Sequence, residues 1–209
     1  MSRMVMRLGL LALLLAGAAA CTPTRPTEFY TLATVTGPAA RPGGSEGLTI
    51  GLGPISLPQY LDRPEIVTRE GTNQMRLAEF HRWAEPLEPL ITRIMAEDLY
   101  ALLDARDVIP LPQRGDLPLD RAVEVDIGRF DADAAGEVVL DARWRLYRGD
   151  STELLASGRS LVREPAAPVP DYAAIVAAMS RAVGQVSEEI AQAIAGPPPV
   201  PARRERVSG

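Results

Sequence analysis

Residues 171–196 read DYAAIVAAMSRAVGQVSEEIAQAIAG, the clearest predicted element in the chain. Its large apolar side chains recur at steps of three and four residues, which places them on one stripe of a long helix. Asp171 is the predicted N-cap, and Gly196 with the proline after it is the predicted end. A helix with one apolar stripe has to bury that stripe against another layer. The stripe consists of Tyr172, Ile175, Val176, Met179, Val183, Val186, Ile190 and Ile194.

A second one-sided helix is predicted for residues 86–105, with Pro86 in its first turn. Both apolar stripes are interpreted as core rather than as a cofactor groove. The stripe of this helix consists of Leu87, Leu90, Ile91, Ile94, Met95, Leu99, Leu102 and Leu103. Alternating apolar residues before and between the helices predict strands. The predicted strands are residues 28–35, 48–55, 65–69, 74–78, 123–127, 138–146 and 154–162.

The order of these elements predicts an α+β fold. We expect a two-layer sandwich, with a mostly antiparallel sheet and two amphipathic helices on one face. Residues 65–69 and 74–78 form a predicted hairpin, and the three strands between the helices are expected to be antiparallel. Asp131 and Asp133 fall in the turn predicted at residues 131–136, where solvation or local hydrogen bonds are expected for them.

The N-terminus predicts export and a lipid anchor. Arg3 and Arg7 precede an uncharged run that is too short to span a membrane and ends in small residues. Cys21, the only cysteine, follows directly, and the sequence around it resembles the lipobox of bacterial lipoproteins, with Ala18 where that pattern usually has Leu. An ordinary secretory signal with an incidental cysteine is the alternative. The predicted organisation is a signal peptide at 1–20, the acylated cysteine and a short tether at 21–27, one α+β domain at 28–195 and a disordered Pro/Arg-rich tail at 196–209.

Composition excludes several classes of function. The formal net charge is −5, and loss of Arg3 and Arg7 with the signal peptide makes it −7, so binding to nucleic acid is not expected. His81 is the only histidine and Cys21 is assigned to lipid, which excludes a Cys-His pair and a zinc site built from several His or Cys ligands. A Ser-His-Asp site through His81 stays open, but no serine lies in a supporting motif. We therefore expect a non-enzymatic protein without a cofactor or a metal.

Two segments look more specific than a core requires. Residues 57–69 read LPQYLDRPEIVTR, and residues 78–87 read AEFHRWAEPL, which leads into the first helix. Both combine aromatic, arginine and carboxylate side chains with proline, and Arg, Trp and Tyr dominate interface hot spots. The alternative is a structural network in which Arg63 or Arg82 pairs with Asp62 or Glu85. The candidate partner or oligomer interface consists of Tyr60, Asp62, Arg63, His81, Arg82, Trp83 and Glu85.

These segments resemble the PqiC/YmbA family of ABC-type transport auxiliary lipoproteins. The resemblance continues through residues 125–131 (VDIGRFD) and 140–144 (LDARW) to the terminal helix. It implies an outer-membrane lipoprotein that works with a periplasm-spanning MCE-domain protein and an inner-membrane transport component. Because such MCE proteins form closed rings, a matching homo-oligomeric ring is one expectation of the resemblance. Thr22 after the cysteine favours the outer membrane, by resemblance to lipoprotein sorting in Gram-negative cells.

The resulting hypothesis is a non-enzymatic docking component of a trans-envelope lipid-transport system. It sits on the periplasmic face of the outer membrane, anchored in the bilayer through Cys21, and supports membrane integrity. The alternative is a periplasmic carrier lipoprotein that binds lipid in its own cavity. A carrier needs apolar residues beyond those that two stripes and one sheet face bury, and this chain has only a modest surplus.

Overall fold

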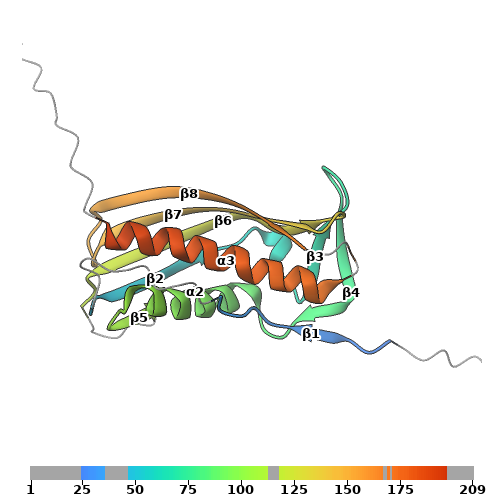
Figure 1. Cartoon of the computed structure of the whole chain (residues 1–209), viewed down its shortest axis with the longest axis horizontal. Helices are drawn as coiled ribbons and strands as arrows, with labels where there is room; N and C mark the ends of the chain where they lie inside the picture. Colours follow the sequence, from blue (N-terminus) through green and yellow to red (C-terminus); the bar gives the residue numbers. More distant parts are fainter. Residues whose placement is uncertain (1–24, 36–46, 113–117, 167–168, 170, 197–209) are drawn as a thin grey trace, which may run out of the picture.

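The computed structural model describes residues 25–35, 47–112, 118–166, 169 and 171–196 (Figure 1). The predicted signal peptide, the acylation site Cys21, part of the tether and the predicted tail beyond Gly196 lie outside these ranges. The predictions made for those segments therefore stay predictions.

Eight strands and two α-helices form the described part of the chain. In chain order they are β1 (Glu28–Tyr30), β2 (Thr49–Ser56), the 3-10 helix η2 (Gln59–Leu61), β3 (Glu65–Arg69), β4 (Met75–Trp83), α2 (Leu87–Leu103), β5 (Asp107–Pro110), β6 (Arg121–Asp133), β7 (Glu137–Arg148), β8 (Leu154–Pro165) and α3 (Tyr172–Ala195).

One sheet contains all of these strands. Its longest ladders are the antiparallel pairs β6–β7 and β7–β8, and β3–β4 form the predicted antiparallel hairpin. On the side away from β7, β6 pairs in parallel with β2 along its first half and with β3 at its last two residues. β5 extends the sheet beyond β2, and β1 extends it beyond β4, both in parallel. The predicted α+β class with a mostly antiparallel sheet is confirmed.

Both helices lie on one face of the sheet (Figure 1). α3 packs on β6, β7 and β8, α2 packs on β2 and β5, and the two helices contact each other. Every residue of the two predicted stripes is buried, because these stripes face the sheet and the neighbouring helix. The predicted cap is also confirmed, since the Asp171 carboxylate accepts a hydrogen bond of 3.0 Å from the Ala174 N–H. α2 begins one residue later than predicted, with Pro86 as its N-cap.

The sheet differs from the prediction at β1, β4 and β5, and also at β6, which continues to Asp133. The strand predicted at 28–35 ends at Tyr30, because the chain then turns toward α3, where the Ala33 N–H donates to Ser180 Oγ at 3.2 Å. β5 was not predicted, since it is only four residues long and pairs in parallel. β4 continues to Trp83, five residues beyond the predicted end of this strand at residue 78.

The prediction that Asp131 lies in a turn is wrong. Asp131 belongs to β6 and is fully buried, because arginines from two strands and a tyrosine surround its carboxylate. Asp133 does shape the turn to β7, since its Oδ1 accepts hydrogen bonds from the N–H groups of Ala135 and Glu137.

Candidate partner-binding surface

The two segments singled out in the sequence meet at the start of α2. Residues 57–64 connect β2 to β3 through η2, and residues 84–86 connect β4 to α2. The two connections are held together by the β3–β4 pair, in which Glu65 lies opposite Arg82. The Trp83 N–H also donates to the Pro64 carbonyl oxygen at 2.7 Å. This arrangement brings side chains from both segments to one place on the molecule.

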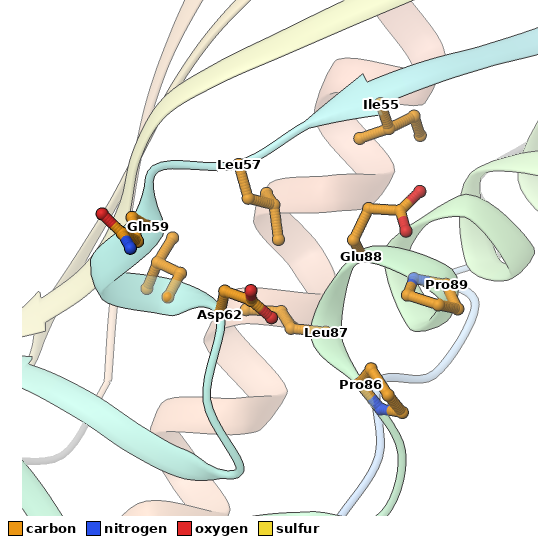
Figure 2. Close-up of a pocket in the computed structure, with 9 residues that line it drawn as sticks. Ile55, Leu57, Gln59, Asp62, Pro86, Leu87, Glu88 and Pro89 are labelled. Carbon is orange, nitrogen blue, oxygen red and sulfur yellow. The ribbon is translucent and has the colours of Figure 1, made fainter.

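Two adjoining pockets occupy this place, and we call them together the α2-start surface. The smaller has a volume of about 330 Å³ and is lined by Asp62, Arg63, Pro64, Trp83, Ala84, Glu85 and Pro86. The larger, of about 510 Å³, is lined by Ile55, Leu57, Gln59, Leu61, Asp62, Pro86, Leu87, Glu88 and Pro89 (Figure 2). Asp62 and Pro86 line both pockets, so the two are contiguous. Leu57 lies between β2 and η2, and Leu87 is the first residue of α2. Both line the larger pocket, with Asp62 and Glu88 beside them (Figure 2).

Tyr60 fixes η2 to the sheet rather than lining either pocket. Its hydroxyl donates to Asp131 Oδ2 at 3.0 Å. Arg69 and Arg129 donate to the same carboxylate through their Nε atoms, at 3.1 and 2.9 Å. Burial, together with the negative charge of Asp131, raises the pKa of Tyr60 to about 12, so the phenol stays protonated. No local sequence pattern indicates this cluster, because Tyr60 and Arg69 precede Asp131 by 71 and 62 residues.

Three other candidates also have intramolecular roles. Trp83 is 5 % exposed and belongs to the core while its edge lines the smaller pocket. Arg82 pairs with Glu65 across the β3–β4 hairpin at 3.2 Å. Glu85 accepts a hydrogen bond from Arg93 on α2 at 2.7 Å. The ion pairs are therefore Arg82–Glu65 and Arg93–Glu85, which differ from the predicted pairing of Arg63 or Arg82 with Asp62 or Glu85.

His81 lies away from both pockets, where β1, β4 and α3 meet. Its ring stacks on Tyr172 with a centroid distance of 4.1 Å, and its Nδ1 lies 2.9 Å from the Tyr30 hydroxyl. Tyr30 in turn donates to Glu28 at 2.6 Å. His81 therefore joins the short strand β1 to the rest of the fold, and the structure does not bring it together with the other candidates.

Asp62 and Arg63 remain without an ion pair or a side-chain hydrogen bond among the described residues. Asp62 is exposed, Arg63 is half-buried, and the Nε of Arg63 is buried without an acceptor. The α2-start surface thus combines an apolar floor with one free cation and one free anion. Such a surface can hold an apolar side chain and choose its partner by charge.

A family model for the ABC-type transport auxiliary lipoprotein component matches residues 30–191. The chain belongs to this family. The family implies a membrane-anchored lipoprotein of the cell envelope that assists an ABC-type transporter, and the match spans both segments that form the α2-start surface. A search of functionally curated proteins gave no match.

Two solved structures share the fold of this auxiliary lipoprotein. An uncharacterized protein is 19 % identical, with a TM-score of 0.66 over 81 % of this chain and 99 % of that one. A Xanthomonas campestris protein of family DUF330 is also 19 % identical, with a TM-score of 0.66 over 79 % and 93 % of the two chains. At this identity the likeness extends to the fold alone.

Neither helix in the described part of the chain is long and apolar enough to cross a membrane. The described residues also contain no group of three or more His, Cys, Asp or Glu side chains arranged to hold a metal ion.

Proposed function

We propose that this auxiliary lipoprotein is anchored in the outer membrane through Cys21 and docks the MCE-domain protein of its transport system on the α2-start surface. The MCE partner and the outer-membrane location rest on the sequence resemblance of residues 57–69 and 78–87, and on Thr22. In this role the protein links the membrane to the end of the periplasm-spanning component and performs no chemistry of its own.

The observation that supports docking is that two charged side chains of this surface have no ion-pair partner among the described residues. Arg82, which lies beside this surface, and Glu85, which lines it, have ion-pair partners, whereas Asp62 and Arg63 have none in the part of the chain that the structure describes. Leu57 is only partly buried and packs at the edge of the core beside the larger pocket. Apolar contact area surrounded by polar groups is the usual make-up of a protein interface.

The packing between the layers favours docking over lipid carriage. An acyl chain bound inside the fold would need space between the helices and the sheet. Leu90 and Leu99 on α2, Ile175 and Ile190 on α3 and Phe130 on β6 are all 0 % exposed. No water-sized space touches these side chains, so the protein's own residues fill that region of the interior.

The anchor is tested with Cys21→Ser in the full chain. We expect a folded protein that no longer fractionates with membranes, because acyl chains are the proposed hold on the bilayer. A density gradient of the wild-type membranes tests the location. Fractionation unchanged by Cys21→Ser would contradict the anchor, and recovery with inner membranes would contradict the outer-membrane assignment.

The docking surface is tested by co-purification of the acylated full chain with the MCE-domain protein of the same system. Leu57→Asp should abolish co-purification, because a charge would enter the larger pocket. Leu161→Asp is the matched control, since Leu161 is 54 % exposed on β8 and lines neither pocket. Thermal melts should show both variants folded. Equal co-purification of the two variants would contradict the proposed surface.

A further inference from the structure

We infer that Arg63 is the residue by which the α2-start surface recognises its partner: it receives the carboxylate of an acidic side chain that lies next to an apolar side chain of the partner. This inference rests on the proposed docking function and specifies the chemistry of the segment that docks.

The first argument is the state of the Arg63 guanidinium. Its Nε is buried and has no acceptor, and the side chain makes no ion pair with any described residue. A buried donor on a charged group lowers stability until an acceptor reaches it. Of the two neighbouring arginines, Arg93 is paired with Glu85, and Arg82 is paired with Glu65 through Nη2 although its own Nε also lacks an acceptor. Arg63 is therefore the cation at this surface that is available to a partner.

The second argument is the distribution of charge between the two pockets. The larger pocket has Asp62 and Glu88 among its lining residues and no arginine or histidine. An acidic side chain would be repelled there, whereas an apolar one fits between Leu57 and Leu87. The smaller pocket shares Asp62 with the larger one but also contains Arg63, and its Glu85 is held by Arg93 at 2.7 Å. The acid of the partner is thus directed to Arg63, and the adjacent apolar side chain to the larger pocket.

The third argument is the apolar lining around Arg63. Pro64, Trp83 and Pro86 border the same pocket, and the Nε of Arg63 is buried from water. Charge-assisted hydrogen bonds between a guanidinium and a carboxylate are strong and directional, and they strengthen where water is excluded. An arginine in this setting selects a carboxylate more sharply than an arginine on an open strand does.

The absence of lysine from the chain makes a direct test available. All 22 basic residues are arginines, so Arg63→Lys introduces the only side-chain amine. A water-soluble carbodiimide joins such an amine to a carboxylate only when the two are in contact. With the acylated full chain bound to the MCE-domain protein, we expect a new amide cross-link from position 63 to an acidic residue of the partner, located by mass spectrometry.

The matched control is Arg143→Lys, at an exposed arginine of β7 that has no ion-pair partner among the described residues. Arg143→Lys should give no cross-link to the MCE-domain protein beyond the wild-type background. Binding affinity provides the second measurement: Arg63→Ala should weaken binding about 30-fold or more, whereas Arg143→Ala should change it less than about two-fold. Thermal melts of both alanine variants should match the wild type within a few degrees.

The possible failures are distinguishable. If the wild-type chain does not bind the MCE-domain protein, the proposed function fails. If the wild type binds, but Arg63→Ala binds equally well and Arg63→Lys gives no cross-link at position 63, the docking role stands and the role of Arg63 is wrong.

Discussion

Two buried carboxylates in this molecule have opposite surroundings, because one has hydrogen-bond partners and the other has none of normal geometry among the described residues. Asp131, where η2 meets the sheet, is fully buried and accepts hydrogen bonds from Tyr60, Arg69 and Arg129. Asp98, on α2, is 4 % exposed, and neither of its oxygens makes a hydrogen bond of normal geometry. The paired carboxylate fixes η2, a single 3-10 turn whose own backbone hydrogen bonds, from Leu61 to Pro58 and from Asp62 to Gln59, do not attach it to the sheet. The unpaired one lies on a regular helix, which the rest of the apolar stripe already fixes.

The difference has a consequence for ionisation. Burial raises the pKa of Asp98 from 3.8 to about 6, with Glu97 and Glu188 contributing in the same direction and the Ser187 hydroxyl opposing it. Asp98 is thus neutral in mild acid and charged at neutral pH. Its charged form is the one that the fold accommodates poorly.

A third buried carboxylate, introduced by mutation, should show the largest effect. Met179 is 1 % exposed in the middle of the α3 stripe, so Met179→Asp buries a charge with no partner. We expect a loss of about 4 kcal/mol or more in the free energy of unfolding, enough to unfold a marginally stable domain. Gln192→Asp, on the exposed face of the same helix, should cost about 0.5 kcal/mol. Thermal melts that show both variants equally benign would mean that α3 does not pack as described.

Breaking the paired carboxylate should rank second. Asp131→Asn keeps the shape of the side chain but leaves Arg69 and Arg129 without their counter-charge. We expect a loss of about 3 kcal/mol, measured by urea denaturation. The control is Asp126→Asn, because Asp126 is exposed and accepts a single hydrogen bond from Ser56. If the two variants lose equal stability, the Asp131 cluster does not hold η2.

Neutralising the unpaired carboxylate should have the smallest effect, and the opposite sign. Because the folded-state pKa of Asp98 is raised, the folded protein binds more protons than the unfolded chain between about pH 4 and 6, and stability falls as pH rises through this window. Asp98→Asn should remove this fall. At pH 7 the variant should be more stable than the wild type by about 2 kcal/mol, and at pH 4 the two should agree. A variant that is less stable at pH 7 would show that Asp98 has a partner in solution.

The contrast between the two carboxylates also explains what the sequence could predict. Both helices, the hairpin and the long strands follow from the spacing of apolar residues, because each buries one face. Asp98 has the spacing of the α2 stripe, four residues after Ile94 and four before Leu102, but a carboxylate is not expected in an apolar stripe. Asp131 was placed in a turn because Asp-Ala-Asp-Ala-Ala-Gly is typical of turns. Its partners Tyr60 and Arg69 precede it by 71 and 62 residues, and no local pattern records such a distance.

That the two segments form an interface stays a prediction. The structure does bring Asp62, Arg63, Trp83 and Glu85 to one pocket at the start of α2. Composition could not say which charges are already paired. That Arg82 contacts Glu65, and that Arg63 contacts no carboxylate, depends on the register of the β3–β4 hairpin. His81 was included for its chemistry, but the parallel β1–β4 pairing places it elsewhere.

The β1–β4 pairing determines how a pulling force on the N-terminal tether reaches the fold. β1 is the first strand of the described chain and pairs with β4 through only three residues, the last of which joins Tyr30 to Trp83. The Ala84 N–H then donates to the Tyr30 carbonyl oxygen at 2.8 Å, just before Pro86 and α2. In a chain held at Cys21 and docked at the start of α2, a pulling force between these two points acts across the three-residue β1–β4 pairing. The strands β6, β7 and β8 of the same sheet do not carry this force.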